Sequence, residues 1–168
     1  MSRPLITLTT DFGLADSYVA AMKGVILSIC PEATVVDISH EIRPQAVGQA
    51  AYVLSTAVAY FPPGTVHLVV VDPGVGTRRR AVAVQTGRAL YVAPDNGVLS
   101  LALATHPRKG VAHDPACTAV HLTAARYHRP EVSATFHGRD LFAPAAAHLA
   151  CGAGLEEMGQ VLSPEDLI

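Results

Sequence analysis

The chain has 168 residues, half of them apolar, which suits one α/β domain with a sizeable core. A formal net charge of −2 gives no sign of a surface for nucleic acid or membrane. The sequence starts without a signal-peptide pattern and has no apolar run long enough to cross a membrane, so we expect a cytoplasmic protein. Cys30, Cys117 and Cys151 lack CxxC spacing and are predicted to be buried free thiols in a reducing compartment.

Strand and helix signals alternate through the first part of the chain. Short β-branched runs predict strands, and apolar residues at helical spacing predict helices. Such alternation favours a mostly parallel central sheet with helices on both faces. In chain order we expect a strand at 5–9, a loop at 10–16, a helix that Ser17 caps and Pro31 stops, a strand at 34–38, a polar loop at 39–44, a helix at 45–60 and, after a breaker cluster at 61–65, a strand at 66–72.

The second part of the chain predicts shorter elements. Its last helix has Pro144 in the first turn and Gly152 just beyond the end, both favourable positions. Residues 106–117 give no clear element beyond one candidate edge strand. The other expected elements are a β-hairpin at 81–85 and 89–93, a turn at 94–97, a short helix at 98–105, a candidate edge strand at 120–122, a polar loop at 126–131 and the last helix at 142–150.

The stretch at 69–80 draws most attention, because an apolar run ends in a carboxylate, a Gly/Pro turn and three arginines. Asp72 is expected at the carboxyl end of a buried strand, where open α/β sheets bind ligands. Arg78 to Arg80 can aim a guanidinium back at it. The alternative is a surface turn with solvated arginines. A second polar stretch at 135–140, rich in His, Arg and Asp between apolar flanks, favours the functional interpretation.

Other polar residues have structural interpretations beside the functional ones. Asp11 and Asp16 follow the first strand and suit ribose hydroxyls or an ammonium group, although Asp16 also favours the start of a helix. The Asp95-Asn96-Gly97 segment is typical of a turn. Asp140 could cap the last helix. Seven of the eight histidines show no metal-ligand spacing, and His137 differs because Gly138, Arg139 and Asp140 follow it immediately.

Five segments together resemble the S-adenosylmethionine hydroxide adenosyltransferase family, relatives of the fluorinase and chlorinase enzymes. The resemblance implies that water cleaves S-adenosylmethionine to adenosine and L-methionine, without a cofactor or a bound metal. Tyrosine stands in the halogenating relatives where this chain has Asp72 and His137, which favours the hydroxide chemistry. The matching segments are Thr10-Asp11-Phe12-Gly13, Asp16-Ser17-Tyr18-Val19, the run at 71–77, Ala93-Pro94-Asp95-Asn96-Gly97 and the run at 135–140.

The resemblance also implies roles for individual residues. The expected catalytic trio is Asp72, Arg79 and His137, which should converge within hydrogen-bonding or one-water distance. Asp11 is expected to bind the ribose and to face the same cleft as Asp72. The remaining expected substrate-binding residues are Asp16 near the methionine part, Phe12 and Asn96 in ligand-lining motifs, and Gly138, which would keep its position free of a competing side chain.

One departure from the family concerns length. Residues 1–160 are expected to form the catalytic-type domain and 161–168 the start of a linker, without the family's second, β-rich domain. Family sites form between subunits of a homotrimer, so we expect this chain alone to turn over substrate slowly. One alternative is a non-catalytic nucleoside-binding or assembly domain. Another is a metal-dependent hydrolase that uses Asp11, Asp16, Asp72 and His137.

Overall fold

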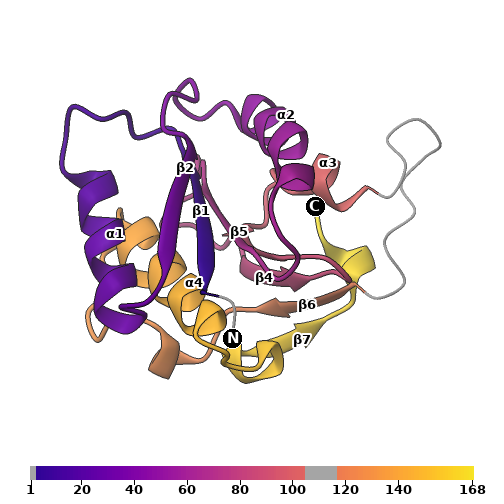
Figure 1. Cartoon of the computed structure of the whole chain (residues 1–168). Helices are drawn as coiled ribbons and strands as arrows, with labels where there is room; N and C mark the ends of the chain where they lie inside the picture. Colours follow the sequence, from indigo (N-terminus) through magenta and orange to yellow (C-terminus); the bar gives the residue numbers. More distant parts are fainter. Residues whose placement is uncertain (1–2, 105–116) are drawn as a thin grey trace.

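The structure, a computed structural model, describes residues 3–104 and 117–168. Seven strands from these residues form one sheet in the order β2-β1-β3-β5-β4-β6-β7 (Figure 1). The strands are β1 Leu5–Thr10, β2 Thr34–Ser39, β3 Val66–Val70, β4 Ala81–Gln85, β5 Leu90–Pro94, β6 Thr118–His121 and β7 Gln160–Leu162. The α-helices are α1 Tyr18–Ile29, α2 Val47–Ala57, α3 Ser100–Leu103 and α4 Ala143–Ala150.

The sheet is mixed, so the expected α/β class is correct but the mostly parallel sheet is not. Strands β2, β1, β3 and β5 run parallel, whereas β4, β6 and β7 are joined to their neighbours by antiparallel pairing. The predicted hairpin explains the change of direction, because the short turn after β4 forces β5 to return antiparallel beside it. β6 and β7 then extend the antiparallel half of the sheet.

Helices cover both faces of the sheet, as expected. One apolar cluster joins α1 and α4 to side chains such as Ile6, Leu8 and Leu68. The other joins α2 and α3 to side chains such as Val69 and Val71. Because neighbouring residues of a strand point to opposite faces, β3 supplies both clusters and is buried along its whole length.

Several local expectations need correction. Ser17 stands at the N-cap position of α1, but its side chain makes no capping hydrogen bond. The second helix begins at Val47, two residues later than expected, because Gln45 adopts a left-handed conformation with φ of 64°. β7 was not predicted, since three residues carry little periodic signal. The candidate strand within 106–117 lies, except for Cys117, outside the described residues.

Two cysteines do not match the prediction of free thiols. A disulfide joins Cys30 to Cys151, with their Cα atoms 5.9 Å apart. These residues directly follow α1 and α4, so the bond links the ends of two packed helices. The two cysteines are 121 residues apart in the sequence, so no local pattern predicts that they pair. Cys117 is buried, as expected. None of the helices in the described parts of the chain has the length and hydropathy needed to cross a bilayer.

Candidate active site

A cleft of about 260 Å³ opens where β1 and β3 end. These strands run parallel, with Thr10 beside Val70, so the residues that follow them emerge at one edge of the sheet. Asp11 and Asp72 both line the cleft, which confirms the expectation that they face the same space. The lining residues are Asp11, Phe12, Pro44, Gln45, Val70, Asp72, Val75, Thr135, Phe136, His137 and Gly138.

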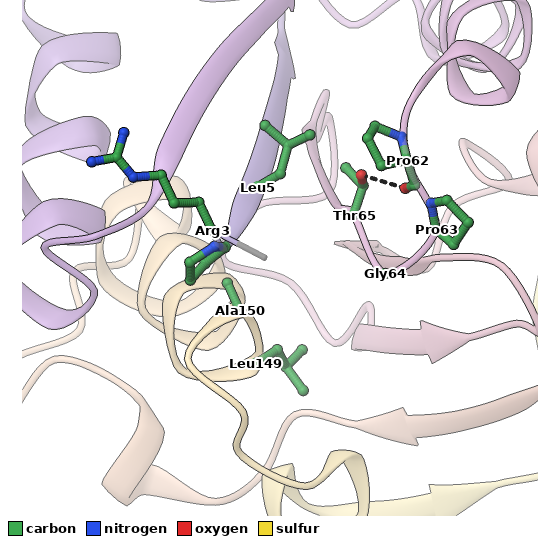
Figure 2. A pocket seen from close by; sticks show the side chains of 9 residues that line it. Arg3, Leu5, Pro62, Pro63, Gly64, Thr65, Leu149 and Ala150 are labelled. Atoms are coloured by element: carbon green, nitrogen blue, oxygen red, sulfur yellow. Dashed lines mark hydrogen bonds between the residues drawn. The ribbon is translucent and has the colours of Figure 1, made fainter. Parts of the chain in front are cut away.

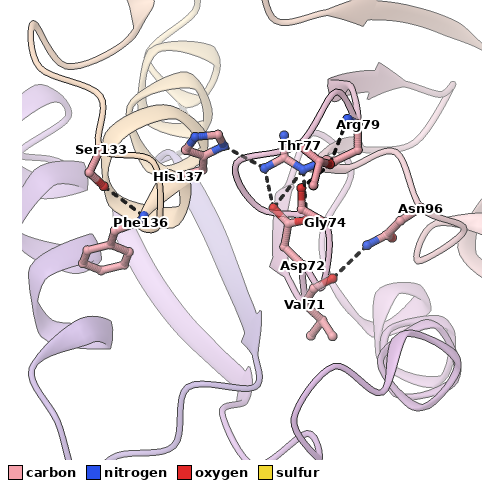
Figure 3. A network of polar contacts seen from close by, with 9 residues as sticks. All are labelled: Val71, Asp72, Gly74, Thr77, Arg79, Asn96, Ser133, Phe136 and His137. Atoms are coloured by element: carbon pink, nitrogen blue, oxygen red, sulfur yellow. Dashed lines mark hydrogen bonds and ion pairs between the residues drawn. The ribbon is translucent and has the colours of Figure 1, made fainter.

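Arg79 lies between the two other members of the expected trio (Figure 3). Its Nε donates to both carboxylate oxygens of Asp72 at 2.9 Å, and its Nη2 also pairs with Oδ2. The same Nη2 lies 2.8 Å from Nδ1 of His137. The Arg79 and Asp72 side chains are only 10% and 5% exposed, and the guanidinium packs over the ring of Phe142, 5.1 Å from its centroid. The trio therefore converges, with Arg79 as the bridge.

The turn after Asp72 folds so that Arg79 returns to the strand end. The Thr77 hydroxyl donates to the carbonyl of Gly74 at 2.6 Å and accepts from the Arg79 amide at 3.3 Å. Gly76 has φ of 76°, and a Cβ there would lie 2.7 Å from the carbonyl oxygen of Ala134. Only glycine permits this close approach, which brings the segment before His137 against the turn.

His137 leads into an unpredicted π-helical turn, Gly138–Phe142, ahead of α4. Single π-turns within helices are frequent at functional sites. The buried carboxylate of Asp140 accepts from the amide of Ser133 at 2.9 Å and from Nε of Arg139 at 2.6 Å. Asp140 thus organises the loop before His137, which is more than the capping role first considered for it.

Gly138 lines the cleft as predicted, but its missing side chain has a further reason. A Cβ at this position would lie 3.3 Å from both Sδ of Met22 and Cε2 of Phe12. Either contact is tighter than ordinary van der Waals packing. Glycine therefore lets the π-helical turn pack closely against α1 and the Phe12 loop.

The hydrogen bond with Arg79 determines the proton positions of His137. Arg79 can only donate, so Nδ1 of a neutral imidazole must accept and the hydrogen must reside on Nε2. Burial and the neighbouring Arg79 charge lower the pKa of His137 below its usual 6.5, against opposing effects from Asp72, Asp140 and the backbone of Ser133. The ring is therefore neutral at pH 7, and within the trio only Asp72 has lone pairs left for a water molecule.

Two expected ligand residues lie elsewhere. Asn96 is not among the lining residues, and its Nδ2 donates to the carbonyl of Val71 at 2.9 Å, fixing the backbone beside Asp72. Asp16 is exposed in the loop before α1 and does not line the cleft. Sequence reasoning missed Gln45, which lines the cleft and donates its backbone N–H to Oδ2 of Asp11 at 2.7 Å. No local signal marks a glutamine in a left-handed conformation.

Two further features of the structure bear on the chemistry. In the described residues, no three His, Cys, Asp or Glu side chains are grouped so as to hold a metal ion. A separate hollow of about 220 Å³ lies near the start of β1 and the end of α4 (Figure 2). Among the described residues, Arg3 is the only ionisable one that lines it, and the Thr65 hydroxyl there already donates to the carbonyl of Pro62 at 2.7 Å. The charged groups that converge therefore lie at the cleft where β1 and β3 end, and not at this second hollow.

Fold and site together define an α/β domain that holds a half-buried Asp–Arg–His constellation at the carboxyl edge of a sheet. The family described as the SAM hydroxide adenosyltransferase N-terminal domain matches residues 6–159, and the chain belongs to it. An (R)-S-adenosyl-L-methionine hydrolase from Salinispora tropica is 48% identical over 165 residues, covering 98% of this chain. A fluorinase from Nocardia brasiliensis is 30% identical over 194 residues, covering 99% of the chain.

A solved structure gives the same relationship in three dimensions. An uncharacterised conserved protein from Thermotoga maritima superposes with a TM-score of 0.84 and 43% identity over 95% of this chain. The match covers 58% of that protein. Likewise, this chain spans 60% of the length of the Salinispora hydrolase and of the Nocardia fluorinase.

Proposed function

We propose that this domain supplies the water-activating half of an enzyme that hydrolyses S-adenosylmethionine to adenosine and L-methionine. The observation that carries the proposal is Arg79, held between the carboxylate of Asp72 and Nδ1 of His137 in a cleft. The names of the hydrolases that match the chain at 38–48% identity support the same substrate. We further propose that no cofactor takes part and that the reaction is cytoplasmic.

The proposed step is a displacement at the ribose C5′. A water oxygen forms a bond to C5′ while the C5′–S bond breaks and its electron pair stays on sulfur. The leaving group is then a neutral thioether, so it needs no general acid. The water gives up one proton, and the products are adenosine, L-methionine and that proton. The main task for the protein is to hold the oxygen in line and remove it from bulk water.

Each member of the trio has a distinct task in this proposal. Asp72 accepts a hydrogen bond from the attacking water, because its carboxylate keeps acceptor capacity beside the Arg79 contacts. Arg79 stabilises the developing hydroxide character. His137 orients Arg79 through Nδ1, and its neutral state avoids a second positive charge beside the guanidinium.

Substrate binding would begin with Asp11, whose Oδ2 already accepts from Gln45 and whose Oδ1 remains for a ribose hydroxyl. Phe12 and Phe136 offer aromatic surface at the same cleft. We propose that Asp16 and Asn96 contribute only at its margin. The adenine pocket and much of the lid would come from a second domain, in a neighbouring subunit of a homotrimer. Without that cover, charged groups act in a high dielectric and hold the substrate weakly.

Product analysis tests this proposal. The 168-residue chain and a version extended with a second domain from a family member are each incubated with S-adenosylmethionine. Liquid chromatography with mass detection should show adenosine and L-methionine in equal amounts, with the extended form about a thousandfold faster if the cover contributes ~4 kcal/mol. Binding without product in both forms would instead support a nucleoside-binding module. Product that disappears with a chelator would support a metal-dependent hydrolase.

A further inference from the structure

A buried polar network lies next to the loop that carries Asp11, at the end of β1. The Oγ1 of Thr10, at the end of β1, is 2.8 Å from Nδ1 of His40. On the other side of the ring, Nε2 lies 3.0 Å from Oδ1 of Asp37, whose Oδ2 accepts from Lys23 at 2.7 Å. Thr10 is fully buried and the His40 side chain only 2% exposed. Such groups are costly to bury unless they are paired.

The charge of Asp37 indicates which atoms of this network donate hydrogen bonds and which accept them. Burial raises the pKa of Asp37, but the hydrogen bond from Lys23 and the nearby His40 ring together hold it below its ordinary 3.8, so this carboxylate is ionised at neutral pH. A hydrogen on Nε2 of His40 then faces a negative charge, although the contact is not a linear hydrogen bond. In the neutral ring with its hydrogen on Nε2, Nδ1 accepts from the Thr10 hydroxyl.

The same residues hold the backbone of the loop above them. Because the Thr10 hydroxyl donates to His40, its lone pairs are free for the Phe12 amide, which donates to it at 3.2 Å. The carbonyl of His40 accepts from the amide of Gly13 at 2.8 Å. Thr10 and His40 therefore fix two consecutive amides, directly after the Asp11 carboxylate.

We propose that His40 is a positioning residue, which acts through Thr10 and through its own carbonyl to hold Asp11 and Phe12 in place for a nucleoside ligand. The identity of the ligand rests on the proposed function, but the anchoring of the loop does not. His40 is not among the residues that line the cleft. Its contribution is to preorganise the loop, which should appear in ligand affinity more than in the chemical step.

The chain contains its own control for this idea. Thr7, three residues earlier on β1, pairs with His67 in the same manner, with Oγ1 2.7 Å from Nδ1. Thr7 and His67 are also buried, at 0% and 1% exposure. In the part of the chain that the structure describes, neither side chain lines the cleft or accepts a hydrogen bond from a loop amide. Thr7→Val likewise removes a buried hydroxyl that is paired with a buried histidine, without reaching the site.

Amide hydrogen exchange of the unliganded chain tests the anchoring. In Thr10→Val the Phe12 amide should exchange at least tenfold faster than in the wild type, because it has lost its acceptor. In Thr7→Val the exchange of the Phe12 and Gly13 amides should stay within about twofold of the wild type. Equal exchange at Phe12 in the two variants would overturn the proposal, whatever the ligand.

Titration with adenosine tests the consequence. Thr10→Val and His40→Leu should weaken its binding about tenfold, the value of one net hydrogen bond, whereas Thr7→Val should change it less than twofold. His40→Asn, whose side-chain oxygen can replace Nδ1, should recover most of the affinity. Where turnover is measured, KM should rise more than kcat falls. Parallel losses in Thr7→Val would show a general stability effect and contradict the proposal. Absence of adenosine binding by the wild type would count against the proposed function, while the exchange result would still decide the role of Thr10 and His40.

Discussion

Nη2 of Arg79 lies 2.8 Å from Nδ1 of His137, while the rest of the guanidinium binds the Asp72 carboxylate. One planar cation thus joins two segments that lie 58 residues apart in the sequence. The arrangement fixes the histidine as an acceptor toward arginine and leaves the aspartate to face the cleft. Five donors in a rigid fork make this double contact possible, and a lysine could reproduce only part of it.

Arg79→Lys tests the fork directly. The variant keeps the positive charge but cannot bind Asp72 through two nitrogens and reach His137 as well. We expect kcat for S-adenosylmethionine cleavage to fall about a hundredfold or more, with adenosine affinity within about twofold of the wild type. Steady-state kinetics and calorimetric titration measure the two quantities. The matched control is Arg78→Lys at the exposed neighbouring position, which should keep wild-type kinetics. Equal losses in the two variants would contradict a specific role for Arg79.

Asp11→Asn tests the ribose-binding carboxylate. Asparagine keeps one neutral acceptor oxygen, which can hold the Gln45 amide, and it presents a donating NH2 group where the second carboxylate oxygen stood, so a ribose hydroxyl loses its charged acceptor. We expect adenosine binding to weaken about tenfold or more, and the free energy of unfolding to change by less than about 1 kcal/mol. Glu41→Gln removes a charge from an exposed position nearby and should leave binding unchanged. Unaltered affinity in Asp11→Asn would remove this residue from the site.

His67 should make stability depend on pH. Burial, helped by the Arg88 charge, lowers its pKa from 6.5 to about 4. Between these values the unfolded chain binds more protons than the folded protein, so stability rises with pH and is lost as the pH falls from about 6.5 to about 4. The loss should reach about 3 kcal/mol for this residue. Urea denaturation at pH 7 and pH 4 should show a smaller difference for His67→Gln than for the wild type. Equal differences would mean that His67 titrates normally.

The disulfide should contribute strongly to stability. Its sequence separation of 121 means that the bond removes much of the entropy of the unfolded chain, by up to about 5 kcal/mol in the chain-entropy description. Reduction with dithiothreitol should therefore lower Tm clearly. Cys30→Ala with Cys151→Ala should have a similarly low Tm that no longer responds to the reductant. A wild-type Tm insensitive to reduction would show that the bond does not form in solution.

Two residues of the site could be predicted from local signals alone, because each of them follows closely on the end of a strand. Asp11 and Asp72 end parallel strands, so their common edge follows from alternating strand and helix signals. Arg79 and His137 were placed by motif resemblance, and their contact required a turn whose Gly76 could be recognised in advance. Their functional roles remain predictions.

The features that escaped prediction depend on contacts between distant segments. The Cys30–Cys151 bond exists because α1 and α4 pack side by side, which no spacing rule reveals. The left-handed conformation of Gln45 accompanies a hydrogen bond to Asp11, 34 residues away. The π-helical turn places Asp140 under the loop before His137. Such details arise from tertiary packing and are invisible to local propensity.

The most direct test of the account is the fate of the water oxygen. S-adenosylmethionine is incubated with the extended protein in water enriched in ¹⁸O, and the mass of the released adenosine is measured. Direct attack on C5′ predicts adenosine heavier by the mass of one label, placed on the 5′-oxygen, and Arg79→Lys should slow its appearance without changing its position. Unlabelled adenosine, or a product cleaved elsewhere than at the C5′–S bond, would contradict the account.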